Sequence, residues 1–336
     1  MNLEDRKLFE EAERRMELVQ ADDRAIRQRM YRARYKGEVV SPVRGFYARK
    51  EWFEGLPKES QVIAKAKALH ITNPDWVFSG ATAAVIHGLP IPPSRMDDLG
   101  HISPGRKKAQ GKDRAPHRPP FKKRDRFEPT KAIVNGLPVT SLEETVFECT
   151  RSLDFRQGLA VCDCALKKSG LGKEEFARRV LSFRIQGKRG SWKTEYPLDY
   201  MDARSGSVAE SIARAIMIEN LYQLPELQVD VRGLFKRNES YRVDFLWLLP
   251  DGTRVAGEYS DPTRPDESEG SGGMKDADSG AEAKKRARRR RSNGVTLMRF
   301  GPMDLLSDRR FCGILDEYGI PCEGRRTGSM ALKEAA

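Results

Sequence analysis

The sequence predicts an α+β protein of several domains, because helical patterns prevail up to Phe183 and alternating strand patterns follow from Tyr241. The 336 residues suit two or three domains at roughly 100–200 residues each. Hydrophobic residues make up 38% of the chain, enough for each domain to bury its own core. We expect two helices and a β-hairpin over 1–55, a helical middle domain over 56–200, an α/β domain over 201–322 and a tail over 323–336.

The chain is strongly basic, with a formal net charge of +12 at pH 7 and a pI of about 9.5. A charge of this size favours an anionic partner, most often nucleic acid. A soluble basic enzyme is the alternative.

Several protein classes are excluded by what the sequence lacks. No window of about 18 apolar residues occurs, so no membrane-spanning helix and no membrane partner is expected. The charged N-terminus lacks the apolar core of a secretory signal. The five cysteines are odd in number and irregularly spaced, which argues against a zinc site or a disulfide framework. We therefore expect free thiols in a reducing cytoplasm.

Two helices are expected at the N-terminus. The first spans Leu3–Val19. The second runs to about Tyr35, with Asp22 and Asp23 at its N-terminal cap and Gly37 at its end. The inner face of the second helix carries Ile26, Met30 and Ala33.

A β-hairpin with its turn at Arg44-Gly45 follows, and Pro42 places its first strand at a sheet edge. A basic helix before a basic hairpin is the plan of a winged helix–turn–helix: between Arg24 and Arg49 there are eight Lys/Arg and one acidic residue. This predicts binding to double-stranded DNA, and a solvated helix beside an ordinary hairpin is the alternative. The candidate contacts are Arg24, Arg27, Gln28, Tyr31, Arg34 and Arg44.

The middle domain is expected to be mostly helical. A small-residue helix begins near Ser79 or Gly80 and ends at Gly88, where His87 is expected to be packed rather than catalytic. A basic loop at 104–131 either adds phosphate contacts or is a solvated connector. The other expected elements are a helix at Gln61–His70, a strand or hairpin at Ile133–Val139, helices from the capping box Ser141–Glu144 to Leu166 and over Lys173–Phe183, and a polar linker over 184–204.

Three motifs in the first 170 residues resemble one family. They are the segment ending Val43-Arg44-Gly45-Phe46-Tyr47-Ala48, the run Ser79–Pro90 and the run Asn135–Glu148. Together they are similar to AbiEi-type antitoxins and transcriptional regulators of type IV toxin–antitoxin systems. The resemblance implies a winged helix and a helical middle domain that act on a promoter rather than as catalysts. A cognate nucleotidyltransferase-like toxin as partner would favour a toxin-neutralising role.

The C-terminal domain places carboxylates in a pattern that suits a metal. Tyr241–Leu248 alternates as a strand, a Pro250-Asp251-Gly252 turn follows, and Val255–Tyr259 returns. Asp244 and Glu258 lie seven residues either side of Asp251, so a hairpin sets them opposite each other. They could hold Mg²⁺ and thereby activate water, with Glu210 as a third carboxylate.

Structural alternatives exist for all three carboxylates. Ser207 and Glu210 form a capping box, Asp244 suits the polar face of a strand, and Glu258 suits an ordinary salt bridge.

The segment over about 205–322 resembles the very-short-patch-repair-like branch of the PD-(D/E)XK nucleases, which implies an α/β restriction-endonuclease-like domain. That pattern has a lysine two residues after the glutamate, where this chain has Ser260. Ser260 neither orients water nor neutralises charge, so a degenerate site is expected unless Asp261, Arg264 or Lys275 substitutes.

A polar insertion at 261–283 is predicted to be disordered. The run Lys284–Arg291 has seven basic residues in eight, and we expect a helix there leading to a strand at Val295–Phe300. Arg288 and Arg289 would contact phosphates, with a solvated charge run as the alternative. A last helix is expected at Phe311–Tyr318.

The leading functional prediction is a DNA-binding regulator of the antitoxin type that carries an endonuclease-like domain. The alternatives are an active Mg²⁺-dependent DNA endonuclease in phage defence or repair, and a protein that neutralises a toxin by binding it.

Overall fold

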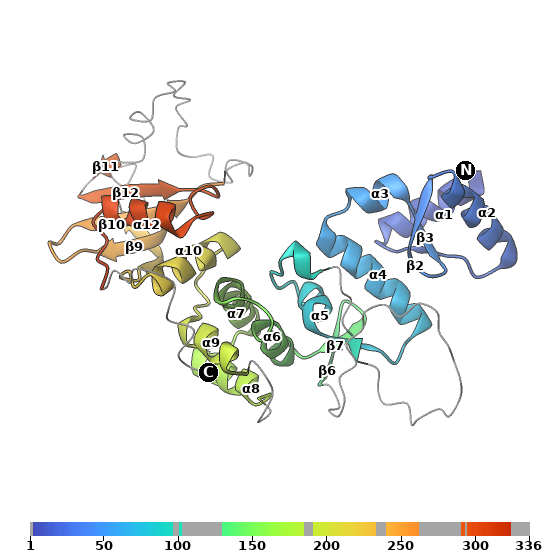
Figure 1. Ribbon diagram of the computed structural model, residues 1–336, viewed down its shortest axis with the longest axis horizontal. Helices are drawn as coiled ribbons and strands as arrows, with labels where there is room; N and C mark the ends of the chain where they lie inside the picture. Colours follow the sequence, from blue (N-terminus) through green and yellow to red (C-terminus); the bar gives the residue numbers. More distant parts are fainter. Residues whose placement is uncertain are drawn as a thin grey trace, which may run out of the picture. The chain divides into compact units, whose positions relative to one another are not determined.

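The computed structural model describes residues 3–96, 101–102, 130–184, 191–232, 240–261, 290–292 and 294–323. The chain divides into two compact units. The first unit comprises 1–161 and 168–199, and the second unit comprises 162–167 and 200–336. The fold is mixed α/β, with one sheet of three strands, one of four and one of five in the part that is described (Figure 1).

The first unit begins with a helix pair and a small sheet. The predicted second helix and the hairpin are both confirmed: the Asp23 side chain accepts a hydrogen bond from the Ile26 amide (2.7 Å), and Gly45 turns the hairpin at φ +83°. The sheet order is β1-β3-β2, so Pro42 lies on an edge strand as expected. The elements are α1 (Leu3–Arg14), β1 (Val19–Gln20), α2 (Arg24–Tyr35), β2 (Val39–Val43) and β3 (Phe46–Arg49).

The first helix is shorter than predicted. It ends at Arg14, because Met16 adopts φ +54° and the Glu17 amide donates back to the Ala12 carbonyl (2.9 Å). Val19 instead pairs with Tyr47 in the sheet. A left-handed residue at a helix end is usually glycine, so the methionine gave no sequence signal.

The middle region contains a four-stranded sheet of order β5-β4-β7-β6 beside its helices. The sequence predicted only a strand or hairpin at Ile133–Val139, and the structure has the hairpin β6–β7 there. His87 is packed as expected, with Nε2 2.8 Å from the Thr140 carbonyl oxygen. The elements are α3 (Lys50–Gly55), α4 (Lys58–Thr72), β4 (Val77–Phe78), α5 (Gly80–Ile86), η1 (Pro93–Arg95), β5 (His101–Ile102), β6 (Lys131–Val134), β7 (Leu137–Thr140), α6 (Leu142–Thr150), α7 (Phe155–Ser169), α8 (Lys173–Leu181), η2 (Ser191–Thr194) and α9 (Glu195–Tyr200).

The predicted linker over 184–204 is wrong in its second half, where α9 buries Pro197 and Leu198. A six-residue helix is too short to show a period in a polar sequence. The basic loop over 104–131 lies almost wholly outside the described residues, apart from Thr130 and Lys131, and Lys131 begins β6.

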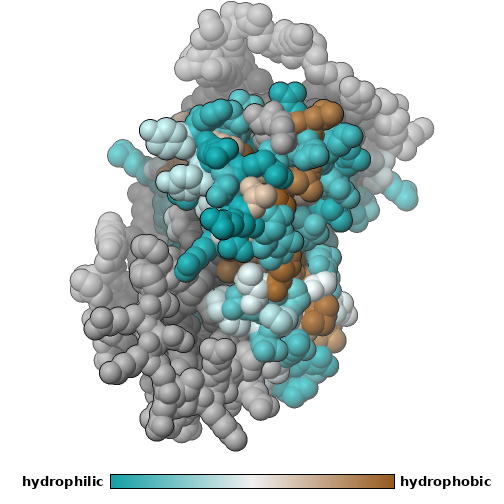
Figure 2. Space-filling model, turned by 90° about the vertical axis from the view of Figure 1, so that its right-hand side faces the viewer, coloured by the Kyte–Doolittle hydropathy of each residue, from teal (hydrophilic) through white to brown (hydrophobic). Residues whose placement is uncertain are grey.

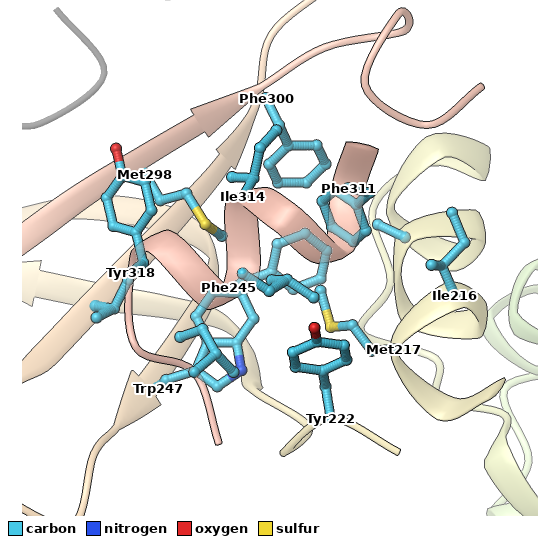
Figure 3. Close-up of a cluster of buried hydrophobic side chains, with 14 of the residues drawn as sticks. Ile216, Met217, Tyr222, Phe245, Trp247, Met298, Phe300, Phe311, Ile314 and Tyr318 are labelled. Carbon is cyan, nitrogen blue, oxygen red and sulfur yellow. The ribbon is translucent and has the colours of Figure 1, made fainter. Parts of the chain in front are cut away.

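The second unit is built on one five-stranded sheet of order β11-β12-β10-β9-β8, in which β10 and β12 run parallel and the other neighbours antiparallel. Its main core joins α10 and α12 to the sheet through Ile216, Phe245, Trp247, Phe300 and Phe311 (Figure 3). The elements are α10 (Val208–Glu219), β8 (Glu226–Arg232), β9 (Ser240–Leu248), β10 (Arg254–Tyr259), β11 (Arg290–Ser292), β12 (Val295–Phe300) and α12 (Asp308–Glu317).

The end of the basic run is a strand rather than the predicted helix. Arg290 and Arg291 pair with β12, and Gly294 at φ +76° reverses the chain between the two strands. Arg288, Arg289 and the insertion over 261–283, apart from Asp261, lie outside the described residues.

A buried ion pair fixes α10 within the second unit. The Asp163 side chain is 2% exposed and accepts hydrogen bonds from the Arg214 guanidinium (2.8 Å) and the Ser211 hydroxyl (2.7 Å). Arg214 also donates to the Tyr200 carbonyl (2.6 Å). Burial raises the pKa of the Asp163 carboxyl, and the charge of Arg214 opposes that shift.

The cysteines and the helices agree with the sequence. All five cysteines are free thiols, as predicted. Among the described residues, every helix is too short or too polar to cross a membrane.

Candidate functional site

The outer face of α2 carries cations that no side chain of the described residues neutralises. Arg24, Arg32 and Arg34 are exposed along the helix, and Lys36 follows at its C-terminal cap. Arg44 is exposed at the tip of the β2–β3 hairpin. We call these five residues the basic surface. The face of the first unit seen in Figure 2 is largely hydrophilic, with small hydrophobic patches.

Arg27, a predicted DNA contact, is exposed but also hydrogen-bonds to the backbone of its own chain. Its guanidinium donates to the Ala21 carbonyl (3.2 Å) and the Asp22 carbonyl (2.8 Å), immediately before α2 begins. These bonds fix the entry of the chain into the helix. The other predicted polar residues of this face, Gln28 and Tyr31, are exposed, Tyr31 by 71%.

Two further arginines of this region are bound by carboxylates of α1. Asp5 is buried and accepts from Arg29 (3.0 Å), and Glu13 accepts from Arg49 (2.6 Å). These pairs tie α2 and β3 to α1. The cations of the basic surface therefore differ from Arg29 and Arg49, because no carboxylate of the described residues pairs with them.

The sequence prediction missed Arg32, Lys36 and Tyr35, which is 90% exposed. They flank the predicted residues on the same exposed side of α2. The buried positions of α2, Met30 and Ala33, could have found them, because every residue away from that apolar stripe faces solvent.

In the second unit, the β9–β10 register agrees with the prediction from the sequence. Gly257 pairs with Phe245 and Arg254 with Leu248 across a five-residue connection, so the next pair in this register is Glu258 and Asp244. The Asp244 carboxylate accepts from the Tyr259 amide (2.9 Å), which holds it beside Glu258. The hairpin register on which the predicted opposition rests is confirmed as far as Gly257 and Phe245.

A glutamine that the sequence did not indicate joins Asp244 to the third carboxylate. The Gln228 side-chain amide lies 3.0 Å from Glu210 Oε2 and 3.1 Å from Asp244 Oδ1. Gln228 has φ +54° within β8, between the pairs Leu227–Phe245 and Val229–Val243. Non-glycine residues seldom adopt this conformation, and no sequence pattern announces it inside a strand. We call Glu210, Asp244 and Glu258 the carboxylate cluster.

Burial raises the pKa of each carboxyl of the cluster. The charge of Asp244 raises the pKa of Glu210 further. The pKa of Glu258 is raised despite the guanidinium of Arg299, which lies 3.1 Å away and favours the charged form. The cluster therefore favours protonation or a cationic partner.

The alternative roles for two of the carboxylates are also present. Ser207 accepts from the Glu210 amide (3.2 Å), and the Glu210 carboxylate accepts from the Gly206 amide (2.7 Å), so Glu210 helps to cap α10. Glu258 forms the salt bridge with Arg299. Arg299 belongs to β12 and faces Glu258 across the parallel pair.

Ser260 supplies no charge to the cluster. It is exposed beyond the end of β10, and its amide donates to the Phe300 carbonyl (2.9 Å). Asp261 is partly exposed, and Arg264 and Lys275 lie outside the described residues. The cation beside Glu258 is therefore Arg299, which the sequence pattern did not indicate.

The donors as arranged do not fit Mg²⁺. Both oxygens of Asp244 accept protein hydrogen bonds, and Glu210 Oε2 accepts two. Glu258 Oε1 is buried without a partner among the described residues, whereas Mg²⁺ prefers six oxygens. In the described part of the chain, no group of three or more His, Cys, Asp or Glu is arranged to hold a metal.

The chain is similar to two uncharacterized proteins of Mycobacterium tuberculosis, one from each of two strains. Each is 36% identical to it over 126 residues, which cover 38% of this chain and 44% of the relative. The match thus spans less than half the length of those relatives. No family model matches the chain, and no solved structure matches it significantly.

Proposed function

We propose that this chain is a DNA-binding regulator of the antitoxin type, in which α1, α2 and the β2–β3 hairpin act as a winged helix–turn–helix. The observation that carries the proposal is the basic surface, whose five cations lack a side-chain partner among the described residues. Exposed cations that the protein leaves uncompensated suit the phosphates of DNA.

The physical basis of binding is the release of counterions. Each phosphate neutralised by Arg or Lys lowers the slope of log affinity against log salt by roughly 0.9, so five contacts predict a slope of about −4 to −5. Phosphate contacts position the protein, and sequence is read at base edges. Gln28 and Tyr31, exposed among these cations, are suited to base contacts.

The test is DNA binding by the full chain against salt, followed by fluorescence anisotropy of a labelled duplex. The triple variant Arg24→Ala, Arg34→Ala, Arg44→Ala should lose about three units of slope. The matched control is Arg178→Ala, Arg179→Ala, Arg204→Ala, which removes three exposed arginines that already pair with carboxylates. Equal losses in the two triple variants would contradict the proposal, because they would report net charge alone.

The regulatory role within this proposal is supported by the likeness of three N-terminal motifs to AbiEi-type regulators. A cytoplasmic protein that represses its own promoter, and that binds a nucleotidyltransferase-like toxin, is the expectation. A reporter fused to the region upstream of the gene should be repressed by the wild type and released by the triple variant. Repression that persists in the triple variant would show that repression does not depend on the basic surface.

A metal-dependent DNA endonuclease of PD-(D/E)XK type is the second candidate, favoured by the β9–β10 register that brings Asp244 and Glu258 to the same end of two neighbouring strands. These carboxylates would have to exchange their present hydrogen bonds to hold a metal. Plasmid incubated with the protein and Mg²⁺ or Mn²⁺ tests it, with Asp244→Asn and Glu258→Gln as controls. Since Arg299 already compensates Glu258, we expect no nicking by the wild type. Cleavage that both variants abolish would establish the second candidate.

A further inference from the structure

An open groove of about 520 Å³, called the cavity below, lies on the first unit between the C-terminal end of α2, strand β2 and helices α3 and α4. Its volume falls within the roughly 300–1,000 Å³ of small-molecule sites. It shares Arg34 with the basic surface, and its other lining residues follow α2 or come from β2, α3 and α4.

The charge of the lining favours an anion. Arg34 and Lys50 line the cavity, are exposed, and have no side-chain partner among the described residues. Lys65 lies 5.8 Å from the centre of the Phe53 ring, which fixes a third cation at the wall. Glu54 is the one acidic residue among the described lining residues.

The lining also has an apolar part. Phe53 is 7% exposed and belongs to a hydrophobic cluster with Val40, and Pro42 of the edge strand borders the same cavity. Cations beside the partly exposed Val40 and Pro42 match a ligand with both a phosphate and an organic group.

We propose that this cavity binds a small phosphorylated molecule of nucleotide size. Its phosphate contacts Arg34 and Lys50, with Lys65 nearby, and its organic group lies against Val40 and Pro42. A DNA phosphate offers the same chemistry from another source, and the experiment below separates the two.

Arg34 belongs both to this cavity and to the basic surface. A ligand that occupies Arg34 removes one cation from DNA, so ligand and DNA weaken each other's binding by the same factor. This consequence rests on the proposed function, whereas binding of the ligand does not.

The test is calorimetric titration of the full chain with pyrophosphate and, separately, with ADP. Both should bind saturably, ADP more tightly because its adenosine reaches the apolar part. Arg34→Ala and Lys50→Ala should each weaken binding at least about tenfold, the loss of one charge-assisted hydrogen bond. The matched controls are Arg32→Ala and Lys36→Ala, which remove the same charges from α2 outside the cavity and should change affinity less than about twofold.

Three outcomes would overturn the proposal: no saturable heat with either compound, equal weakening in the Arg32 and Arg34 variants, or equal affinity for ADP and pyrophosphate. Suppose that neither compound binds and that Arg34→Ala weakens DNA binding much more than Arg32→Ala does. The cavity would then hold a DNA phosphate instead. Ligand binding without any DNA binding would retain this inference and reject the proposed function. Thermal melting of every variant checks that it folds.

Discussion

The basic surface of the first unit and the carboxylate cluster of the second differ in whether the surrounding protein compensates their charges. The cations of α2 and the hairpin tip are exposed and lack side-chain partners among the described residues. The carboxylates are buried or partly buried, and backbone amides, Gln228 and Arg299 bind them. Exposed charges without a side-chain partner are available to a ligand, which is the basis of the proposed function. Charges that the fold pairs internally act first on the stability of the fold.

The largest expected effect is on the free energy of unfolding, and it tests the buried ion pair of Asp163 and Arg214 in the second unit. Arg214→Met leaves Asp163 buried without its cation, so the free energy of unfolding should fall by about 3–5 kcal/mol. Urea denaturation measures it. The control Arg204→Met removes an exposed partner of Asp202 and should cost less than about 1 kcal/mol. Similar losses of stability in both variants would show that the buried ion pair stabilises the fold no more than the exposed one.

A smaller change in the free energy of unfolding is expected from Glu258→Gln, and it depends on pH. Burial holds the pKa of Glu258 in the folded protein above the ordinary 4.5, so the folded state keeps its proton longer than the unfolded state. Stability from this group is full below 4.5 and is lost as the pH rises through the folded pKa. The free energy of unfolding of the variant should therefore rise relative to that of the wild type as the pH goes from 4.5 to neutrality.

Urea denaturation at several pH values measures that gain. The exposed Glu54→Gln serves as the control for loss of a surface charge. A Glu258→Gln variant that loses stability at neutral pH would show that the Arg299 pair outweighs burial.

The smallest effect separates two arginines of α2. Arg34→Ala should lower the salt slope of DNA binding by about one unit with little change in stability. Arg27→Ala should leave the slope nearly unchanged and lower the melting temperature, because its guanidinium binds two carbonyls at the start of α2. If Arg27→Ala lowers the slope as much as Arg34→Ala, the hydrogen-bonded arginine also contacts DNA.

The sequence predicted those features whose signals are local. Asp23 and Gly37 bounded α2, and equal spacing about Asp251 predicted the register of the β9–β10 hairpin. Both follow from rules that act over a few residues: helix capping and hairpin register.

The remaining features depend on contacts that are distant in sequence. Arg299 reaches Glu258 through the parallel pairing of β10 with β12, and β11 is a strand because it adds to the edge of β12. Gln228 acts through a backbone conformation that its residue type disfavours. Arg27 looked like its neighbours on α2, and only its bonds to Ala21 and Asp22 distinguish it.

The proline in edge strand β2 has a consequence for the behaviour of the protein at high local concentration. Pro42 has no amide hydrogen, and the register of β2 shifts between Val40 and Val43. A strand from another molecule would meet a missing donor and an irregular edge there, which disfavours its addition. Many copies crowded along one duplex would bring such edges close together. Under the proposed function, Pro42 would therefore disfavour aggregation of the first unit where DNA binding gathers it most densely.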